Sequence, residues 1–135
     1  AVVTIETIPS DFWRDGLAHL TGQDERQQII FNEMLERVDM PLYCASIIEE
    51  DEIIACGLGV GSKKYLGLFE FATNFAHRRK GLAGAITRAL FARAIADGMT
   101  TAYLQVVCAN EGGRAFWEHM GFTEVLYGYH YRTKL

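Results

Sequence analysis

An α/β fold of the α+β kind, with one mixed and mostly antiparallel sheet, is predicted from three features of this 135-residue sequence. Three apolar runs in the middle of the chain follow one another through short polar connections, which is the pattern of antiparallel neighbouring strands. A long amphipathic run separates the third of them, residues 65–73, from another apolar run, residues 103–107. A helix in that place makes a right-handed crossover, so these two strands should be parallel. Further helical patterns stand before and after this unit.

The first forty residues predict a short strand and two helices. Residues 2–7 are rich in β-branched side chains, and Ser10 then offers an N-cap. The first helix should bury one apolar face and end at a Thr-Gly pair, and the second should begin after Asp24 and end before Pro41. The expected buried positions are Trp13, Leu17 and Leu20 in the first helix and Ile30, Phe31, Met34, Leu35 and Val38 in the second.

The middle of the chain predicts three strands and the crossover helix. Residues 42–48 and 53–60 are joined by four acidic residues, a connection short enough for a hairpin. Residues 65–73 follow a polar turn and form the third strand. Apolar side chains at helical spacing then give residues 82–96 one buried side, and this helix should end near Gly98.

The end of the chain predicts one more helix and one more strand. Residues 110–120 form the helix, Gly121 its left-handed cap, and residues 122–132 a final strand rich in tyrosine. The predicted order is β-α-α-β-β-β-α-β-α-β. Because the sequence contains neither repeats nor low-complexity linkers, we expect residues 1–135 to form a single domain.

Composition and charge exclude several classes of protein. The formal net charge is -4 and the basic residues cluster mainly at one loop, so we expect no nucleic-acid partner. No apolar run is long enough to cross a membrane. Cys44, Cys56 and Cys108 lie in apolar segments without metal-ligand spacing. We therefore expect reduced thiols, no metal, no membrane partner and a soluble protein of the cytoplasm.

The loop at residues 77–84, His-Arg-Arg-Lys-Gly-Leu-Ala-Gly, joins the predicted strand to the crossover helix. Its two glycines bracket the first helical turn, where free N–H groups and the helix dipole favour an anion such as phosphate. The alternative is a solvated basic turn. A P-loop is excluded because Ala85 and Ile86 stand where a Lys-Ser/Thr pair would follow. The glycines at 57, 59 and 61 precede a strand instead of a helix, so they relieve crowding or mark a bulge rather than bind a dinucleotide.

Two motifs on these elements make the chain resemble a GNAT-superfamily N-acetyltransferase. Arg78-x-x-Gly81-x-Ala83 is similar to the family's acetyl-CoA motif, Gln/Arg-x-x-Gly-x-Gly/Ala. Asn110, followed by the run Phe-Trp-Glu-His-Met-Gly-Phe at 116–122, is similar to the family's Asn…Leu-Tyr-x-x-x-Gly-Phe. The resemblance covers nearly the whole chain and is best between residues 65 and 122.

The resemblance implies a sheet splayed between residues 65–73 and 103–107, with acetyl-CoA as cosubstrate in the opening. Main-chain groups of the strand should pair with the pantetheine arm, and amides of the loop should hold the pyrophosphate. An amine would attack the thioester directly, which requires a base, an oxyanion donor and an acid. The cofactor-binding residues that follow are Phe71, Ala72, Thr73, Arg78, Arg79, Lys80, Gly81, Leu82, Ala83, Gly84, Asn110 and Trp117.

The sequence departs from the family pattern at three places. Trp117 stands where many members have a tyrosine acid, so we expect the acid among Tyr127, Tyr129 and Tyr131, whose alternation along one strand would place them on one face. Gly67 stands where some members have a glutamate base, which leaves Glu70 as the candidate base. The tail holds one predicted strand where the family commonly has two, so either that strand runs on or a partner subunit completes the sheet in a homodimer.

Two functions follow as alternatives. The first is an N-acetyltransferase that moves the acetyl group of acetyl-CoA to a primary amine of a small molecule or peptide. The second is a CoA-binding or regulatory module that keeps the fold without the chemistry. The sequence does not identify the acceptor.

Overall fold

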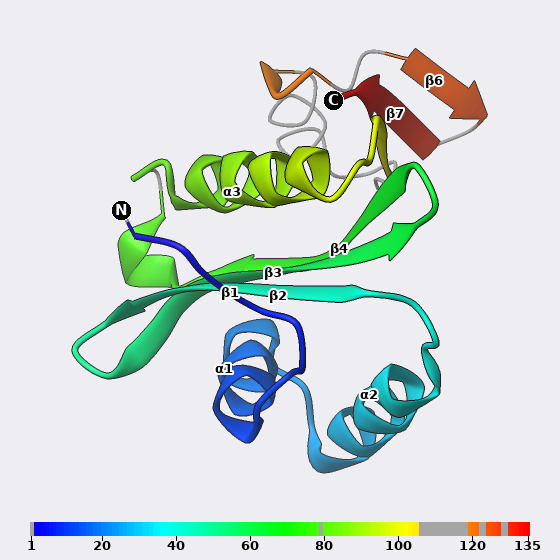
Figure 1. Cartoon of the computed structure of the whole chain (residues 1–135). Coiled ribbons are helices and arrows are strands. Elements are labelled where there is room, and N and C mark those ends of the chain that lie inside the picture. The colour runs from blue at the N-terminus through cyan, green and yellow to red at the C-terminus, as the bar shows by residue number, and fades with distance from the viewer. Residues whose placement is uncertain (1, 79, 106–118, 122–123, 128–129) are drawn as a thin grey trace.

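The computed structural model describes residues 2–78, 80–105, 119–121, 124–127 and 130–135. Its strands form one seven-stranded sheet in the order β1-β2-β3-β4-β5-β7-β6 (Figure 1). The strands are β1 (Thr4–Glu6), β2 (Leu42–Glu49), β3 (Glu52–Ser62), β4 (Tyr65–Thr73), β5 (Thr101–Gln105), β6 (Glu124–Tyr127) and β7 (His130–Lys134). The helices are α1 (Asp11–Thr21), α2 (Glu25–Arg37) and α3 (Leu82–Ala96), with a short 3-10 helix, η1 (Phe75–His77), before α3.

The pairing confirms the predicted fold class. All neighbouring strands are antiparallel except β4 and β5, which are parallel as the crossover through α3 requires. That parallel pairing joins only residues 65–67 of β4 to residues 101–103 of β5. Among the described residues, no pair joins the two strands beyond Gly67 and Tyr103, although β4 continues to Thr73. The sheet therefore opens at this point.

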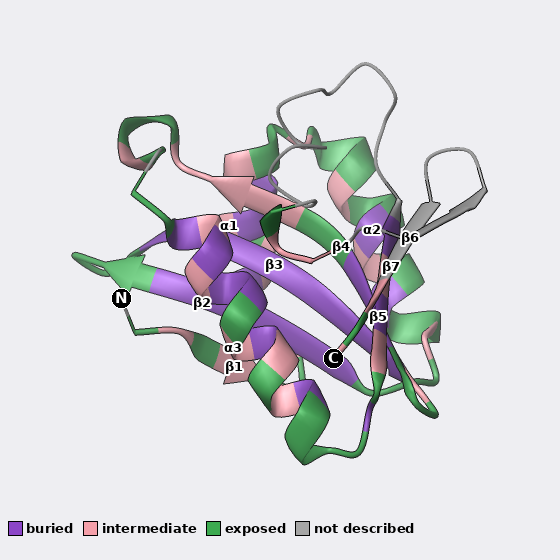
Figure 2. Cartoon of the chain, turned by 90° about the horizontal axis from the view of Figure 1, so that it is seen from above, coloured by how far each residue is buried: buried purple, intermediate pink, exposed green. Residues whose placement is uncertain are grey.

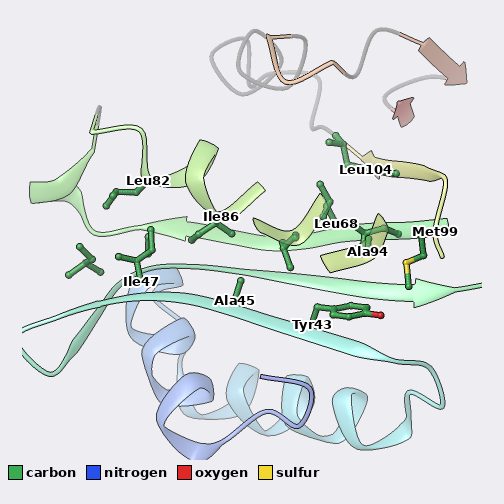
Figure 3. Packing of buried hydrophobic residues seen from close by; sticks show 14 residues of the cluster. Tyr43, Ala45, Ile47, Leu68, Leu82, Ile86, Ala94, Met99 and Leu104 are labelled. Carbon is green, nitrogen blue, oxygen red and sulfur yellow. The ribbon is translucent and has the colours of Figure 1, made fainter. Parts of the chain in front are cut away.

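The helices cover the two faces of the sheet (Figure 1). Helix α3 lies on one face, and α1 and α2 lie on the other. Each face has its own apolar cluster, and the most buried strands are β2 and β3, between the two layers (Figure 2). The cluster under α3 includes Ala45, Leu68, Ile86 and Leu104 (Figure 3). Because β2 and β3 are buried on both faces, they read as continuous apolar runs without alternation.

Side-chain caps place the first two helices where the sequence predicts them. Ser10 accepts a hydrogen bond from the Trp13 amide at 3.2 Å, and Asp24 forms a capping box with Gln27. The predicted stripe of α2 is only partly right, because Phe31 and Leu35 are buried whereas Ile30 and Met34 are 56% and 49% exposed. The two exposed side chains flank the stripe, and α2 buries a narrower face than its sequence suggests. Ile95 of α3 is likewise exposed.

The prediction of one final strand at residues 122–132 is wrong. The structure has two antiparallel strands there, β6 and β7, and β7 pairs with β5. The chain reverses between Tyr127 and His130, and Gly128 is a residue type that hairpin connections favour. The continuous alternation of apolar and polar residues hid this turn. The chain itself thus supplies the last two strands of the sheet.

Other boundaries near the C-terminus differ or fall outside the described residues. The strand predicted at 103–107 begins earlier, and β5 is Thr101–Gln105, because Thr101 and Ala102 already pair with β4. Residues 106 and 107 lie outside the described residues. Most of the helix predicted at 110–120 lies outside the described residues. Gly121 has a φ of 104°, which agrees with its predicted left-handed conformation. Among the described helices, none combines the length and apolar character needed to span a membrane.

We predict that Trp13→Phe destabilises the protein. Trp13 is fully buried, and its indole Nε1 donates to the Ala45 carbonyl oxygen at 3.0 Å. The substitution removes this bond and leaves unfilled volume, which should lower the free energy of unfolding by about 1–3 kcal/mol. Urea denaturation should show a lower midpoint with an unchanged slope. Phe12→Leu, at an exposed neighbouring position of α1, is the matched control, and equal midpoints for both variants would contradict the prediction.

We also predict that alkaline pH destabilises the fold. Burial raises the pKa of Cys44 and of Cys56 from 9.0 to about 12. Below pH 9 the thiols stay protonated in both folded and unfolded chains, so ionisation does not affect stability. Above pH 9 the unfolded chain loses these protons first, so the free energy of unfolding should fall as the pH rises toward 12. Urea titrations at about pH 8 and about pH 11 measure this, and in Cys44→Ala the fall should be smaller.

Candidate functional site

A bulge in β4 stands at the edge of the opening. Leu58 of β3 pairs with Phe69, but Cys56 pairs with Ala72, so Glu70 and Phe71 together oppose Gly57. Glu70 is the extra residue, and it has a φ of 49°, in the left-handed region that non-glycine residues rarely adopt. Its side chain is exposed. The bulge therefore turns a carboxylate out of the strand just where β4 has lost its β5 partner.

The bulge also changes which face each later side chain of β4 occupies. Leu66 and Leu68 pack in the cluster under α3, and Phe71 joins that cluster although it is an odd number of residues further on. Its ring lies close over Gly57, where an added Cβ atom would stand 2.9 Å from Phe71 Cζ. This agrees with the expectation that the glycine relieves crowding opposite a bulge. Ala72 then packs toward α1 and α2.

A tight turn joins β4 to the basic loop. The Asn74 amide donates to the Ile54 carbonyl oxygen at 2.7 Å, and the Asn74 side chain accepts from the Ala76 amide at 2.9 Å. These bonds fix η1 beside the start of β3. The guanidinium of Arg78 lies over the ring of Phe75, 5.1 Å from its centroid. The loop thus leaves the strand in a defined direction, with Arg78 held beside it.

The N-terminus of α3 has the features of an anion site. Gly81 is its N-cap with a φ of 75°, and no side chain in the described part of the chain caps the helix. The first amide bonded within the helix is that of Ala85, which donates to the Gly81 carbonyl oxygen at 3.0 Å. The amides of Leu82, Ala83 and Gly84 precede it and have no acceptor within the helix, and the dipole of this 15-residue helix adds positive potential. Arg78 and Lys80 are exposed on the approach.

The structure brings most of the predicted cofactor-binding residues together. Residues 71–73 form the end of β4, beyond its last described pair with β5, and residues 78 and 80–84 follow after η1, up to the first turn of α3. Arg79, Asn110 and Trp117 lie outside the described residues. No group of three or more metal-ligating side chains was found in the part of the chain that the structure describes.

The three tyrosines predicted as candidate acids do not share one strand. Tyr127 ends β6 and Tyr131 belongs to β7, and only their backbone is described. Tyr129 lies outside the described residues. Alternation along a single strand therefore no longer places the three hydroxyl groups on one face, and each has to be considered separately. The error has the same cause as the missed turn between β6 and β7.

The sequence prediction missed an aromatic pair at the opening. The rings of Phe69 and Tyr103 meet edge to face, with centroids 6.4 Å apart and planes at 88°. Tyr103 pairs with Gly67 at the last position where β4 and β5 are joined. Alternation along each strand assigns Phe69 and Tyr103 to a face of the sheet. The contact between them could be predicted only with the register of β4 and β5.

A separate hollow of about 250 Å³ lies between α1 and the connection of β2 to β3. Asp15, Asp51 and Glu52 line it together with Asn74, at the end of β4. Its carboxylates suit a cation, whereas the start of α3 suits an anion. The two sites therefore differ in the charge of the ligand that they favour.

Comparison with known proteins agrees with this geometry. The model of the Acetyltransferase (GNAT) family matches residues 4–122. A search of curated proteins found no match. The chain is similar in structure to an acetyltransferase of the GNAT family from Staphylococcus aureus Mu50, with a TM-score of 0.79, 11% identity, and 99% of each chain covered.

Two further solved structures with named activities are similar over almost the whole chain. The ribosomal-protein-S18-alanine N-acetyltransferase from Escherichia coli has a TM-score of 0.77 and 18% identity, with 99% of this chain and 93% of that chain covered. An aminoglycoside 6'-N-acetyltransferase complexed with coenzyme A has a TM-score of 0.73 and 12% identity, with 99% and 97% covered. With the family match and the open β4–β5 edge, the chain belongs to the GNAT family, the acyl-CoA N-acyltransferases that use acetyl-CoA as cosubstrate.

Proposed function

We propose that this chain moves the acetyl group of acetyl-CoA to a primary amine of a small molecule or peptide. One observation carries the proposal: a strand that has no β5 partner beyond Gly67 among the described residues leads, through a short turn, to a helix N-terminus whose first three amides have no acceptor within the helix. The first feature suits an extended amide-containing chain such as pantetheine, which can pair as an added strand. The second suits the pyrophosphate at the other end of that arm.

In this proposal the main chain makes most of the contacts to the cosubstrate. Phe71, Ala72 and Thr73 offer backbone groups at the edge of β4 that lies beyond its last described pair with β5. Residues 80–84 surround the pyrophosphate, and the absence of a side chain at Gly81 leaves its approach open. Arg78 and Lys80 add charge. Asn110, Trp117 and Arg79 belong to the proposed site by their place in the family motifs.

The proposed reaction is direct attack by the neutral amine. The nitrogen forms a bond to the acetyl carbon, the carbon–sulfur bond breaks, and the electron pair leaves with the sulfur of CoA. The ammonium proton goes to a base, for which Glu70 is the candidate because the bulge turns its carboxylate outward at the opening. The departing thiolate takes a proton, and Tyr127, Tyr129 and Tyr131 remain individual candidates to donate it.

Two further aspects belong to the proposal. The named relatives act on an alanine of a ribosomal protein and on an aminoglycoside, so both peptide and small-molecule amines are suitable test acceptors. We place the protein in the cytoplasm, where the free thiols of Cys44 and Cys56 would stay reduced.

A turnover assay that detects released CoA with a thiol reagent separates the enzyme from a CoA-binding module. The module would bind CoA but would not release it from acetyl-CoA.

We predict that Gly81→Val lowers the affinity for CoA. A β-branched residue strains the backbone at a φ of 75° and crowds the amides that would bind the pyrophosphate. Hydrogen bonds to charged groups contribute about 1.5–3 kcal/mol each, so titration calorimetry should show a loss of roughly tenfold or more. Lys80→Ala should have a smaller effect, because the amides remain.

Gly98→Val is the matched control for strain. Gly98 follows the other end of α3, has a φ of 92°, and has no neighbouring atom within 4 Å of an added Cβ atom, as at Gly81. Both variants should lose stability, but only Gly81→Val should lose affinity for CoA. If CoA bound to Gly81→Val as tightly as to the unaltered protein, the pyrophosphate site would lie elsewhere.

We predict that Glu70→Gln slows acetyl transfer by about tenfold to a hundredfold without changing the affinity for CoA. The amide cannot accept the ammonium proton, so the dependence of kcat/KM on pH should also change. Glu33→Gln, which alters an exposed carboxylate on α2, serves as the control. An unchanged rate and pH profile in Glu70→Gln would assign the base to water or to another residue.

A further inference from the structure

The aromatic pair lies on the sheet face opposite α3. Leu68 of β4 and Leu104 of β5 belong to the cluster under α3, as Figure 3 shows. Phe69 and Tyr103 each stand one residue away from these leucines, so they point to the other face. Neither ring belongs to the cluster that α1 and α2 cover. The pair therefore stands beyond the core, beside the opening between β4 and β5.

The two rings close over the backbone at the last paired position. An added Cβ atom at Gly67 would stand 2.8 Å from Phe69 Cε2, and also 2.8 Å from the ring carbon Cζ and the hydroxyl oxygen of Tyr103. The absence of a side chain at Gly67 thus lets both rings approach the backbone of β4 closely. Their edge-to-face contact fixes each ring against the other. The result is a preformed aromatic surface and not two independent side chains.

This surface is partly open to solvent. Phe69 is 44% exposed and Tyr103 is half-buried, and Tyr65, which lies further along the same face of β4, is 47% exposed. Each alone is ordinary, because single exposed apolar residues are common. Their position is unusual, because the part of β4 that would bind the pantetheine arm begins immediately after Gly67, the last residue that pairs with the described part of β5. An amine that attacks the thioester would have to pass close to these rings.

We propose that Phe69 and Tyr103 form the acceptor-binding surface and select amines that carry a flat apolar or aromatic group near the reacting nitrogen. This inference rests on the proposed function. Ring faces attract both apolar groups and an approaching ammonium, so the surface can bind the acceptor before its proton is removed. The role of Phe69 and Tyr103 is to determine which amine binds. The competing acceptor is a polycation held by Asp15 and Asp51 in the acidic hollow.

Binding measurements on the CoA-loaded protein test the proposal independently of turnover. We expect 2-phenylethylamine to bind more tightly than n-butylamine or spermidine. Phe69→Leu keeps an apolar side chain but removes the ring, and it should weaken 2-phenylethylamine binding by roughly threefold to tenfold. Binding of n-butylamine and of CoA should not change. Tyr103→Leu should act in the same way, whereas Tyr103→Phe keeps the ring and should retain most of the preference.

Asp51→Asn is the control at the acidic hollow, because asparagine tolerates the φ of 64° found there. It should leave 2-phenylethylamine binding unchanged. If spermidine bound most tightly and Asp51→Asn abolished that binding, the acceptor would bind in the hollow and the proposal would be overturned. Equal binding of 2-phenylethylamine and n-butylamine would also overturn it. Failure of the unaltered protein to bind CoA would instead refute the proposed function, so the two failures are distinguishable.

Discussion

The loss of pairing between β4 and β5 is the constraint on which the candidate site depends. Three residue pairs hold the described parts of these strands together, and beyond them β4 pairs with β3 but with no described residue of β5. Amides and carbonyl groups at a strand edge can form hydrogen bonds with an added chain. The bulge at Glu70 lies in this stretch of β4, and its left-handed backbone costs about 1–2 kcal/mol. Backbone strain of this kind is typical of functional sites.

Strand β4 would offer side chains to the acceptor before the bulge and backbone groups to the cosubstrate after it, because the bulge changes the alternation of the strand. Before the bulge, Phe69 points away from α3 and remains partly exposed. After it, Phe71 packs under α3, and its ring fills the space that Gly57 leaves. Without the extra residue, a side chain at 71 would point to the opposite face. The amide and carbonyl groups of the strand would then point to the opposite edges where the chain enters the turn at Asn74. The bulge thus links the packing of the core to the direction of the loop.

Local signals were enough to predict most elements, whereas tertiary contacts decided what the prediction missed. Ser10 and Asp24 start α1 and α2 by bonds within one turn, and Gly81 and Gly98 bound α3 by their backbone freedom. The exposure of Ile30 and Met34 depends on how α2 packs, which periodicity cannot reveal. Glu70 has no turn-forming signature, so its bulge follows only from the register with β3. The Phe69–Tyr103 contact requires the register of two strands separated by a helix.

The two sides of the opening therefore differ in what the sequence can reveal about them. On the side of α3, the proposed contacts come from the main chain, and the requirement on the sequence is a glycine at a positive φ with small residues, Ala83 and Gly84, in the first helical turn. Such a pattern is readable in one sequence. On the other face, the contacts come from side chains such as Phe69 and Tyr103, which a family motif does not include. The acceptor must therefore be inferred from the structure of this chain and not from its family.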